Sequence, residues 1–253
     1  MNEEPQVLYC DAWLMAIDKP AGMIVHGDGT GERTLTDYAS DLLLAMGDGF
    51  AATDMQPLNR LDRNTTGVVL FSLDKQTQPA FDQMIIDHAF EKHYLALAEG
   101  KIDWNEKLID KPIARDRHDS RKMRVGASGK PSQTRVKVLK RLKSRRGLPT
   151  RSYIDVELLT GRKHQIRVHL TGEDLPLIGD QLYRGRAPGI AVKVENFLEF
   201  HRQALHASRL GLIHPATGEE MEWFVEPPED MIDLMEQLGF GPWDRPVTVF
   251  EKK

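Results

Sequence analysis

The 253-residue sequence is poor in cysteine and in long hydrophobic runs. Its single cysteine, Cys10, excludes an internal disulfide framework and a zinc site built from several cysteines. The longest apolar runs are far too short to cross a bilayer, and the acidic start at Met1–Glu4 is unlike a signal peptide. The stretch Gly27–Arg33 lacks the Gly-Lys-Ser/Thr of a phosphate-binding loop. These absences favour a cytoplasmic protein that is not a P-loop nucleotidase.

The residues that are present predict an α+β protein. Short apolar runs with strand-like alternation are separated by turns, and few segments have helical periodicity. We therefore expect a mixed, largely antiparallel β-sheet flanked by helices and loops. A chain of this length forms one large domain or two small ones, and we expect a single domain over residues 1–253.

Three helices are predicted outside the central part of the chain. The first begins near Thr34 and ends at Gly47. The last covers Asp230–Leu238 and belongs to a C-terminal helix and tail of about residues 229–253. The second covers Asp74–Asp87, with Thr77 as its N-cap. Its inward-facing residues are expected to be Phe81, Met84, Ile85 and His88.

Charge is concentrated in one internal segment. Lys111–Arg151 holds fifteen Lys/Arg against two acids, which is +13, so the rest of the chain is −17 and the sum is the net −4. A basic block in an otherwise acidic chain indicates a surface for a polyanion, built from β-ribbons and loops. The alternative is a solvated basic hairpin that serves only solubility. Five cations of the block are predicted to contact the phosphates of such a polyanion: Lys140, Arg141, Lys143, Arg145 and Arg146.

The stretch Asn59–Gly67 places one carboxylate, Asp62, between two arginines, ahead of turn-forming residues and an apolar strand. A loop that leads into a buried strand is a rigid support for a reactive group. A surface ion cluster worth about 0–1 kcal/mol is the plainer interpretation of the same residues.

Two later segments hold further candidates. In the predicted strand Phe90–Glu99, Tyr94 shares a face with Lys92 and Ala96, and an ordinary core tyrosine would fit this position equally well. Residues from His164 to Leu170 are predicted to form a helix after the turn at Thr160–Lys163.

Several of these stretches match one family in the right order, from about Val7 to about Pro228. They are Asp18–Gly22, Arg60–Asp62 with Thr65–Gly67, Lys92–Leu97, Thr160–Arg167, Ile178–Asp180, and Leu205–Ala207 with His214-Pro215. Together they resemble the RluA-type RNA pseudouridine synthases. The resemblance implies that the protein isomerises uridine to pseudouridine in structured rRNA or tRNA, without a cofactor or metal. It also implies an active-site cleft across the sheet.

The resemblance also implies roles for single residues. Asp62 matches the essential aspartate, Tyr94 the tyrosine that stacks on the target base, and Arg167 the arginine that pairs with the aspartate. Arg60 matches the arginine that helps hold the flipped-out nucleotide. In the segment Thr160–Arg167, RNA contacts are expected from Arg162, Lys163, His164 and Gln165.

The sequence departs from the family pattern in a few places. Asn59 stands where histidine is usual, Thr66 where serine is common, and Leu175 where histidine is frequent. Many members carry an N-terminal RNA-binding domain of the S4 type, and none is expected here. RNA affinity is then expected to come from the catalytic domain and its basic block.

Two other functions remain as alternatives. One is a catalytically silent RNA-binding or ribosome-assembly factor that uses the same surface, and the other is a nucleosidase that breaks the glycosidic bond without re-forming it. We expect a monomer with no obligate protein partner and no membrane association.

Overall fold

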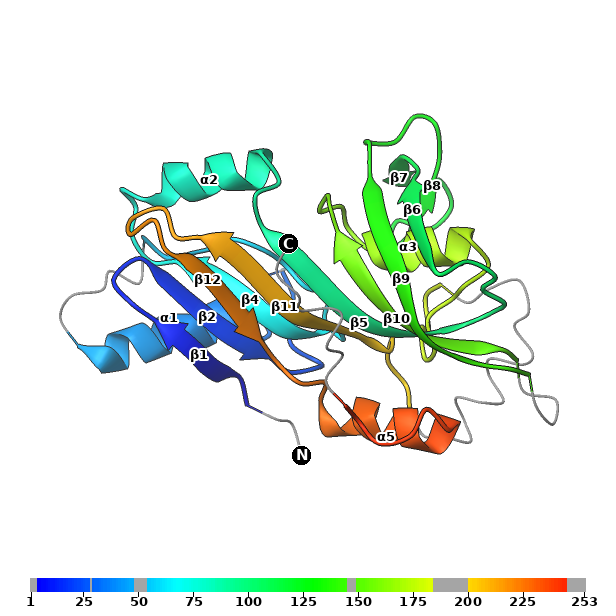
Figure 1. Cartoon of the computed structure of the whole chain (residues 1–253). Helices are drawn as coiled ribbons and strands as arrows, with labels where there is room; N and C mark the ends of the chain where they lie inside the picture. The colour runs from blue at the N-terminus through cyan, green and yellow to red at the C-terminus, as the bar shows by residue number, and fades with distance from the viewer. Residues whose placement is uncertain (1–3, 28, 48–53, 145–148, 184–199, 245–253) are drawn as a thin grey trace. The chain divides into compact units, whose positions relative to one another are not determined.

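Figure 1 shows the computed structural model of the chain, which describes residues 4–27, 29–47, 54–144, 149–183 and 200–244. The chain divides into two compact units. Unit 1 comprises Met1–Lys92 and Ala207–Val225, and unit 2 comprises His93–His206 and Glu226–Lys253. The single domain expected over residues 1–253 stays a prediction, and the two units are described separately below.

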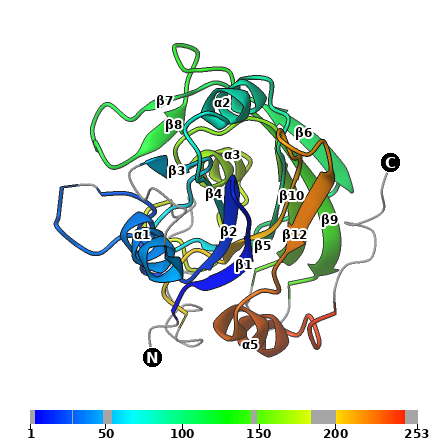
Figure 2. The ribbon, with the colours of Figure 1, turned by 90° about the vertical axis from the view of Figure 1, so that its left-hand side faces the viewer.

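The described residues of unit 1 form a β-sheet with two helices. Its strand order is β1-β2-β4-β11, with β12 paired to β11 and β3 paired to β4. The strands are β1 (Gln6–Cys10), β2 (Leu14–Lys19), β3 (Gln56–Pro57), β4 (Thr66–Ser72), β11 (Leu205–Ile213, in this unit from Ala207) and β12 (Glu220–Phe224), and the helices are α1 (Leu35–Met46) and α2 (Gln78–Ile86). In Figure 2, α1 lies beside the β1–β2 pair.

The α1 helix begins and ends where the sequence predicts. Thr34 caps it with its hydroxyl oxygen, which accepts the Asp37 N–H at 3.1 Å, while the Asp37 carboxylate accepts the Thr34 N–H at 2.8 Å. This reciprocal capping box satisfies backbone donors that have no partner inside the helix. Gly47, with φ of 96°, ends the helix in a conformation that favours glycine.

The α2 helix differs from its prediction in which residues face inward. Phe81 is buried among Leu14, Val68 and Leu70 of the sheet, but Ile85 is 40% exposed. His88 is also exposed, because the helix already ends at Ile86 and the helical period no longer applies to it. The predicted N-cap Thr77 makes no capping bond with its side chain.

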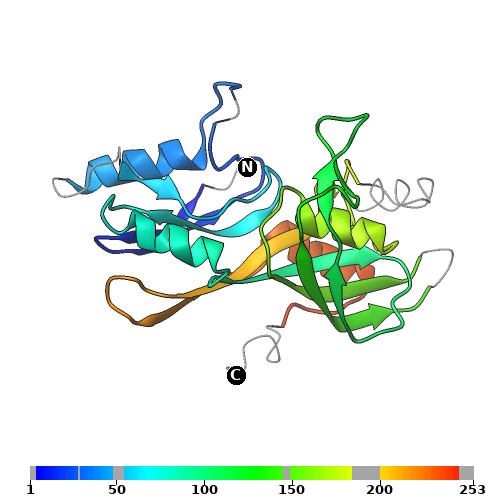
Figure 3. The same cartoon turned by 90° about the horizontal axis from the view of Figure 1, so that it is seen from above.

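The described residues of unit 2 form a four-stranded sheet, a separate hairpin and two helices. The strand order of the sheet is β5-β10-β9-β6, and β7 pairs with β8. The strands are β5 (Glu91–Glu99, in this unit from His93), β6 (Glu106–Asp110), β7 (Ile113–Arg115), β8 (Met123–Val125), β9 (Gln133–Leu142) and β10 (Arg151–Leu158), and the helices are α3 (Gln165–Gly172) and α5 (Glu229–Leu238). In Figure 3, α3 lies beside the β7–β8 hairpin.

The two helices of unit 2 cover different faces of its sheet. On one face Leu95, Leu97 and Tyr153 pack with the α5 residues Met231 and Leu234. The opposite face carries Tyr94, which the antiparallel register places beside Val156 and, through it, beside Val136. Thr134 lies two residues before Val136 and shares its face, and the Thr134 hydroxyl bonds Gln165 and His169 of α3. Tyr94 therefore lies on the face that α3 covers.

The predicted α+β class is confirmed. Every strand pair of the described residues whose register is resolved is antiparallel. Among the same residues, α5 begins at Glu229 and ends before Gly239, as predicted to within one residue. No helix in the described part of the chain has both the length and the apolar character needed to span a bilayer.

Candidate active site

Asp62 lies in unit 1 on the loop that leads into β4, as predicted. Its backbone carbonyl accepts the Thr65 N–H at 3.0 Å, which closes a tight turn around the half-buried side chain. Gly67 then begins the approach of β4 to β11 with φ of 112°. A Cβ at this position would lie 2.2 Å from the Ala207 carbonyl oxygen, so only glycine fits. The Thr65-Thr66-Gly67 motif therefore lets the Asp62 loop pass close to β11.

Asn59 fastens the loop on the side before Asp62. Its amide nitrogen donates to the Val68 carbonyl at 3.1 Å, and its amide oxygen accepts the Leu70 N–H at 2.8 Å. The Asn59 side chain thus bonds the β4 backbone as a neighbouring strand would. The preceding residue adds a further bond to β4, from the Leu58 N–H to the Leu70 carbonyl. The usual family histidine is absent here, and the asparagine has a defined structural role in its place.

Lys19 fastens the loop on the side after Asp62. The lysine is fully buried, and its ammonium donates to the carbonyls of Pro20 at 2.8 Å, Met23 at 2.8 Å and Arg63 at 3.0 Å. These three acceptors use all three ammonium donors. The Gly22 N–H also donates to the Arg63 carbonyl, at 2.9 Å. The motif Asp18–Gly22 therefore supports the Asp62 loop, a role that its sequence did not reveal.

The two arginines beside Asp62 differ in their surroundings. Arg60 is exposed, which suits a residue that binds a nucleotide. Arg63 forms an ion pair with Glu32 and donates to the Gly22 carbonyl at 3.3 Å. Arg63 thereby ties the polar loop before α1 to the Asp62 loop, and Arg60 is the arginine that faces solvent.

Tyr94 and Arg167 both belong to unit 2. Tyr94 is only 5% exposed and lies on the α3-covered face of the sheet, and Arg167 lies in the first turn of α3. Unit 2 therefore brings these two predicted residues to one side of its sheet. Asp62 and Arg60 belong to unit 1.

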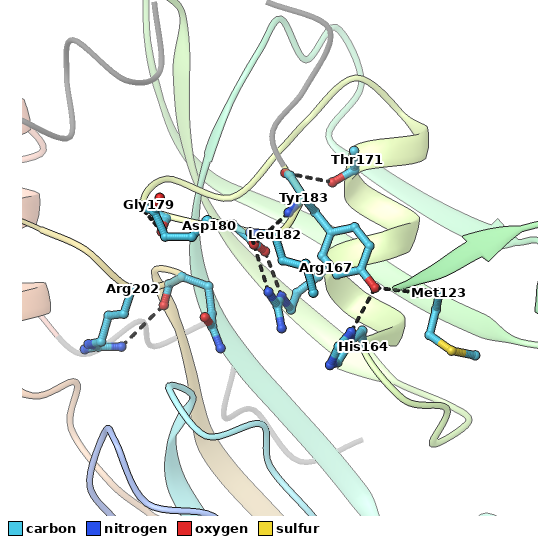
Figure 4. Close-up of polar contacts among 11 residues, drawn as sticks. Met123, His164, Arg167, Thr171, Gly179, Asp180, Leu182, Tyr183 and Arg202 are labelled. Carbon is cyan, nitrogen blue, oxygen red and sulfur yellow. Dashed lines mark hydrogen bonds and ion pairs between the residues drawn. The ribbon is translucent and has the colours of Figure 1, made fainter. Parts of the chain in front are cut away.

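Arg167 is held by a buried carboxylate of the Ile178–Asp180 motif. Its Nε donates to Asp180 Oδ2 at 2.7 Å and its Nη2 to Oδ1 at 2.8 Å (Figure 4). Burial alone would raise the pKa of Asp180, but the hydrogen bonds and charge of Arg167 and the N–H groups of Tyr183 and Leu182 outweigh it and lower the pKa. Asp180 is thus a stable anion that neutralises a cation at the helix N-terminus, where the helix dipole disfavours positive charge.

The turn before α3 places its polar residues differently. Arg162 is half-buried, and Lys163 is exposed. Gln165 is 2% exposed, and its amide bonds the Thr160 hydroxyl, the Arg162 N–H, the Gln133 carbonyl and the Thr134 hydroxyl. Those four bonds saturate the amide. Gln165 therefore shapes the turn that presents Arg162 and Lys163.

Many cations of the basic block are occupied within the protein. Arg135 pairs with Glu157, Lys111 with Glu173, and the amino group of Lys140 donates to the Phe240 carbonyl. Arg141 donates to the Trp104 carbonyl and to Asn105 Oδ1. Lys143 is exposed, and the predicted residues Arg145 and Arg146 lie outside the described residues.

The β7–β8 hairpin and its flank carry a different set of cations. Arg115, Arg117 and Lys130 are exposed, and none forms an ion pair with another residue of the described part of the chain. Sequence alone did not separate these cations from the occupied ones, because partners such as Glu173 lie far along the chain.

Two residues of the site were missed by sequence reasoning. Asp180 lies in a recognised motif. The signal for its role was a carboxylate one residue after the apolar run Leu175–Ile178, a position where a buried carboxylate would need a cation as its partner. Tyr183, whose ring centroid is 4.9 Å from Arg167 Cζ, lies outside every motif and gave no signal.

Solved structures share this fold. The structure titled human RNA pseudouridylate synthase domain containing 4 superposes with a TM-score of 0.72 at 24% identity, covering 92% of each chain. Human RNA pseudouridylate synthase domain containing 1 gives a TM-score of 0.66 at 26% identity, covering 89% of this chain and 84% of that one. The fold is that of RNA pseudouridylate synthase domains.

Sequence relationships give the family. Residues 14–171 match the family described as RNA pseudouridylate synthase. The ribosomal large subunit pseudouridine synthase D of Yersinia pestis is 32% identical over 241 residues, which are 92% of this chain and 70% of that protein. Its counterpart from Pseudomonas aeruginosa is 34% identical over 244 residues, covering 93% and 72%. The chain belongs to the RNA pseudouridylate synthase family and is an isomerase that acts on RNA.

Proposed function

We propose that this enzyme converts specific uridines of ribosomal RNA to pseudouridine, with large-subunit rRNA as the first substrate to test and tRNA as the second. The proposal rests on the relatives named for the large ribosomal subunit and on the six motifs in order. The reaction breaks the C1′–N1 bond, turns the base and joins C5 to C1′. The C5 proton leaves, and N1 gains one.

Asp62 carries the chemistry in this proposal. Breaking the glycosidic bond builds positive charge on the ribose, which a carboxylate stabilises or captures by attack on C1′. Removal of a C2′ proton by the same carboxylate is the alternative first step. The observation that supports this role most directly is the loop itself, which Asn59 and Lys19 hold on both sides of the aspartate.

Tyr94 and Arg167 complete the proposed set. A target base must leave its stack, which costs a few kcal/mol, and an aromatic ring offers a new stacking partner. In this proposal Tyr94 stacks on the base and helps to remove the C5 proton, and Arg167 pairs with the Asp62 carboxylate and lowers its pKa. Arg60 holds the flipped nucleotide.

RNA contacts are proposed for the turn before α3 and for the basic block. Arg162, Lys163 and His164 are assigned to the RNA backbone, with Gln165 acting through the shape of the turn. Lys140, Arg141, Lys143, Arg145 and Arg146 remain proposed phosphate contacts, joined by Arg115, Arg117 and Lys130 of the hairpin region. Cations in rows of this kind suit a phosphate backbone.

The test uses RNA transcripts labelled with tritium at uridine C5, because isomerisation must release this label. Wild-type protein is expected to release tritium from a large-subunit rRNA transcript, and Asp62→Asn is expected to abolish release while RNA binding remains. Asp82→Asn on α2 of the same unit serves as a matched surface control with normal release. Wild-type inactivity on all rRNA and tRNA would favour a silent RNA-binding factor, and free uracil would reveal a nucleosidase.

The proposal includes the state of the protein in the cell. We propose that it acts as a monomer in the cytoplasm without an obligate protein partner. Light scattering of the purified protein should give a mass near 28.7 kDa, and twice that mass would contradict the monomer.

A further inference from the structure

The Arg167 guanidinium is held on its edge and on its face. Asp180 engages the Nε–Nη2 edge through two hydrogen bonds, which lie in the plane of the guanidinium. Tyr183 contacts the face, with its ring centroid 4.9 Å from Arg167 Cζ. An in-plane carboxylate and a stacked ring together restrict both the tilt and the rotation of the group.

The Tyr183 hydroxyl is fixed by two bonds of its own. The Met123 N–H of β8 donates to it at 2.7 Å, and His164 Nδ1 lies 2.8 Å from it (Figure 4). Because the amide supplies the proton of the first bond, the hydroxyl accepts there and keeps both its own proton and a second lone pair for the bond with Nδ1. The ring itself is 7% exposed and packs with Ile113 and Val168.

His164 is held in an unusual backbone conformation just before α3. Its φ of 56° lies in the left-handed region, which costs a residue other than glycine about 1 kcal/mol or more. The imidazole meets the Tyr183 ring edge-on, with centroids 5.5 Å apart and planes at 81°. The His164 carbonyl accepts the Val168 N–H at 2.9 Å, in the first turn of α3. Tyr183 thus secures the strained residue from which the helix bearing Arg167 begins.

Asp180 closes this arrangement. Its Oδ1 accepts the N–H of Leu182 and of Tyr183, each at 2.9 Å, in addition to its bond with Arg167. One carboxylate therefore fixes both the guanidinium and the backbone of the tyrosine stacked on it. The contacts run from Arg167 to Asp180 to Tyr183 to His164 and return to Arg167 through α3.

We propose that Tyr183 is a positioning residue for pseudouridylation, which sets the orientation of Arg167 through its ring and links it to the β7–β8 hairpin through its hydroxyl. The inference rests on the proposed role of Arg167 in the reaction. Tyr183 is not a catalytic residue in this assignment, because it acts through Arg167. The hairpin carries exposed cations at Arg115 and Arg117, so RNA held there would act on the tyrosine whose hydroxyl bonds the hairpin and whose ring lies over Arg167.

The test compares two substitutions in the full-length protein. Tyr183→Phe keeps the ring and removes the hydroxyl bonds, whereas Tyr183→Leu removes both. With a C5-tritiated large-subunit rRNA transcript and saturating enzyme, the single-turnover rate should fall about tenfold for Phe and about a hundredfold for Leu, the scale of a misplaced group. RNA binding should change less than about threefold.

Tyr153→Phe is the matched control. Tyr153 is a buried tyrosine of the same unit, and its hydroxyl has no hydrogen-bond partner among the described residues. It packs on the α5-covered face of the sheet with Phe240 and Trp243. The loss of the Tyr153 hydroxyl in Tyr153→Phe should leave the single-turnover rate unchanged. A wild-type rate in both folded Tyr183 variants would overturn the positioning role.

A second measurement keeps this inference separate from the proposed function. If wild-type protein releases no tritium, the proposed function fails first, and NMR relaxation of the Arg167 Nε–H then decides the positioning claim. That group should be rigid in the wild type and in Tyr153→Phe, and mobile in Tyr183→Leu. Equal rigidity in all three proteins would show that Tyr183 does not position Arg167.

Discussion

Arg167 and Asp180 form a two-pronged ion pair inside unit 2, with nitrogen–oxygen distances of 2.7 and 2.8 Å. Their side chains are 8% and 1% exposed, so the pair is buried. Replacing Asp180 removes the carboxylate that holds the Arg167 guanidinium by two hydrogen bonds, and breaking a buried ion pair costs about 3–5 kcal/mol. Asp180→Asn should therefore lower the free energy of unfolding by about 3 kcal/mol in urea titrations. Asp41→Asn, which breaks an ion pair whose side chains are over half exposed, should change it by less than about 1 kcal/mol.

The same pair should make acid stability depend on Asp180. Because the folded-state pKa of Asp180 is below its ordinary value of 3.8, its contribution is fully present above that pH and is lost as pH falls toward the folded pKa. Urea titrations at a series of pH values from about 5 downward should show a steeper loss for the wild type than for Asp180→Asn. Parallel curves for the two proteins would contradict the assignment.

His169 should control stability in a separate and milder pH range. It is fully buried, and its ring nitrogens bond the Thr134 hydroxyl at 2.8 Å and the Lys111 carbonyl at 2.9 Å. Burial lowers its pKa below the ordinary 6.5, against the opposing effect of the Lys111 carbonyl. The unfolded chain then binds the proton first, so stability falls as pH drops below 6.5 and down to the folded pKa, by at most about 1.4 kcal/mol per pH unit.

The measurement for His169 is the pH dependence of urea unfolding between about 7.5 and 5. His169→Gln should lose stability overall and lose this pH-dependent component as well. His88→Gln, at an exposed position after α2, should keep the wild-type pH dependence. A wild-type curve that is flat below pH 6.5 would contradict a lowered pKa of His169, because the folded and unfolded chains would then bind equal numbers of protons in that range.

Sequence patterns predicted the elements of this fold because those elements follow local rules. Thr34 and Gly47 bound α1 through capping chemistry, and alternation along Glu91–Glu99 placed Tyr94 on the opposite face from Leu95 and Leu97. The position of Asp62 before β4 followed from turn residues ahead of an apolar run. In α2, periodicity overestimated burial: Phe81 is buried and Met84 packs partly buried against the same core, but Ile85 and His88 are exposed.

What sequence could not supply were bonds between distant segments. Arg167 and Asp180 are thirteen residues apart, and Lys19 reaches a carbonyl 44 residues away. Such partners have no fixed spacing, so no local pattern predicts them. The occupied cations of the basic block show the same limit: Lys140 and its acceptor at Phe240 are 100 residues apart.

Asn59 should matter for both stability and turnover. Its amide pairs with Val68 and Leu70 on β4, and the Leu70 N–H is buried. Asn59→Ala leaves that donor unpaired, which costs about 1–3 kcal/mol, and loosens the loop that carries Asp62. The single-turnover rate of tritium release should fall about tenfold or more, on the scale of a group misplaced by a fraction of an ångström.

Two further substitutions sharpen the prediction for Asn59. Asn59→Asp keeps the acceptor for the Leu70 N–H but sets a carboxylate against the Val68 carbonyl, so it should lie between wild type and alanine in stability. Asn59→His installs the residue that is usual in the family, and it should recover activity only if the imidazole can also bond β4. An alanine variant with wild-type stability would show that these two bonds do not hold the loop.

The cations of the basic block should divide into two groups by their effect on RNA binding. Replacing Arg115, Arg117 and Lys130 with Gln removes three exposed charges that form no ion pair within the described residues. Replacing Lys140, Arg141 and Lys143 removes the same charge, but two of these cations already donate to carbonyls of the protein. The salt dependence of binding to an rRNA transcript should therefore flatten more in the first triple variant, by about 0.7–0.9 in log–log slope for each phosphate that is no longer neutralised. A larger change in the second triple variant would assign the phosphate-binding cations to the end of β9. Unchanged slopes in both variants would show that the basic block is a solvated surface that does not bind RNA.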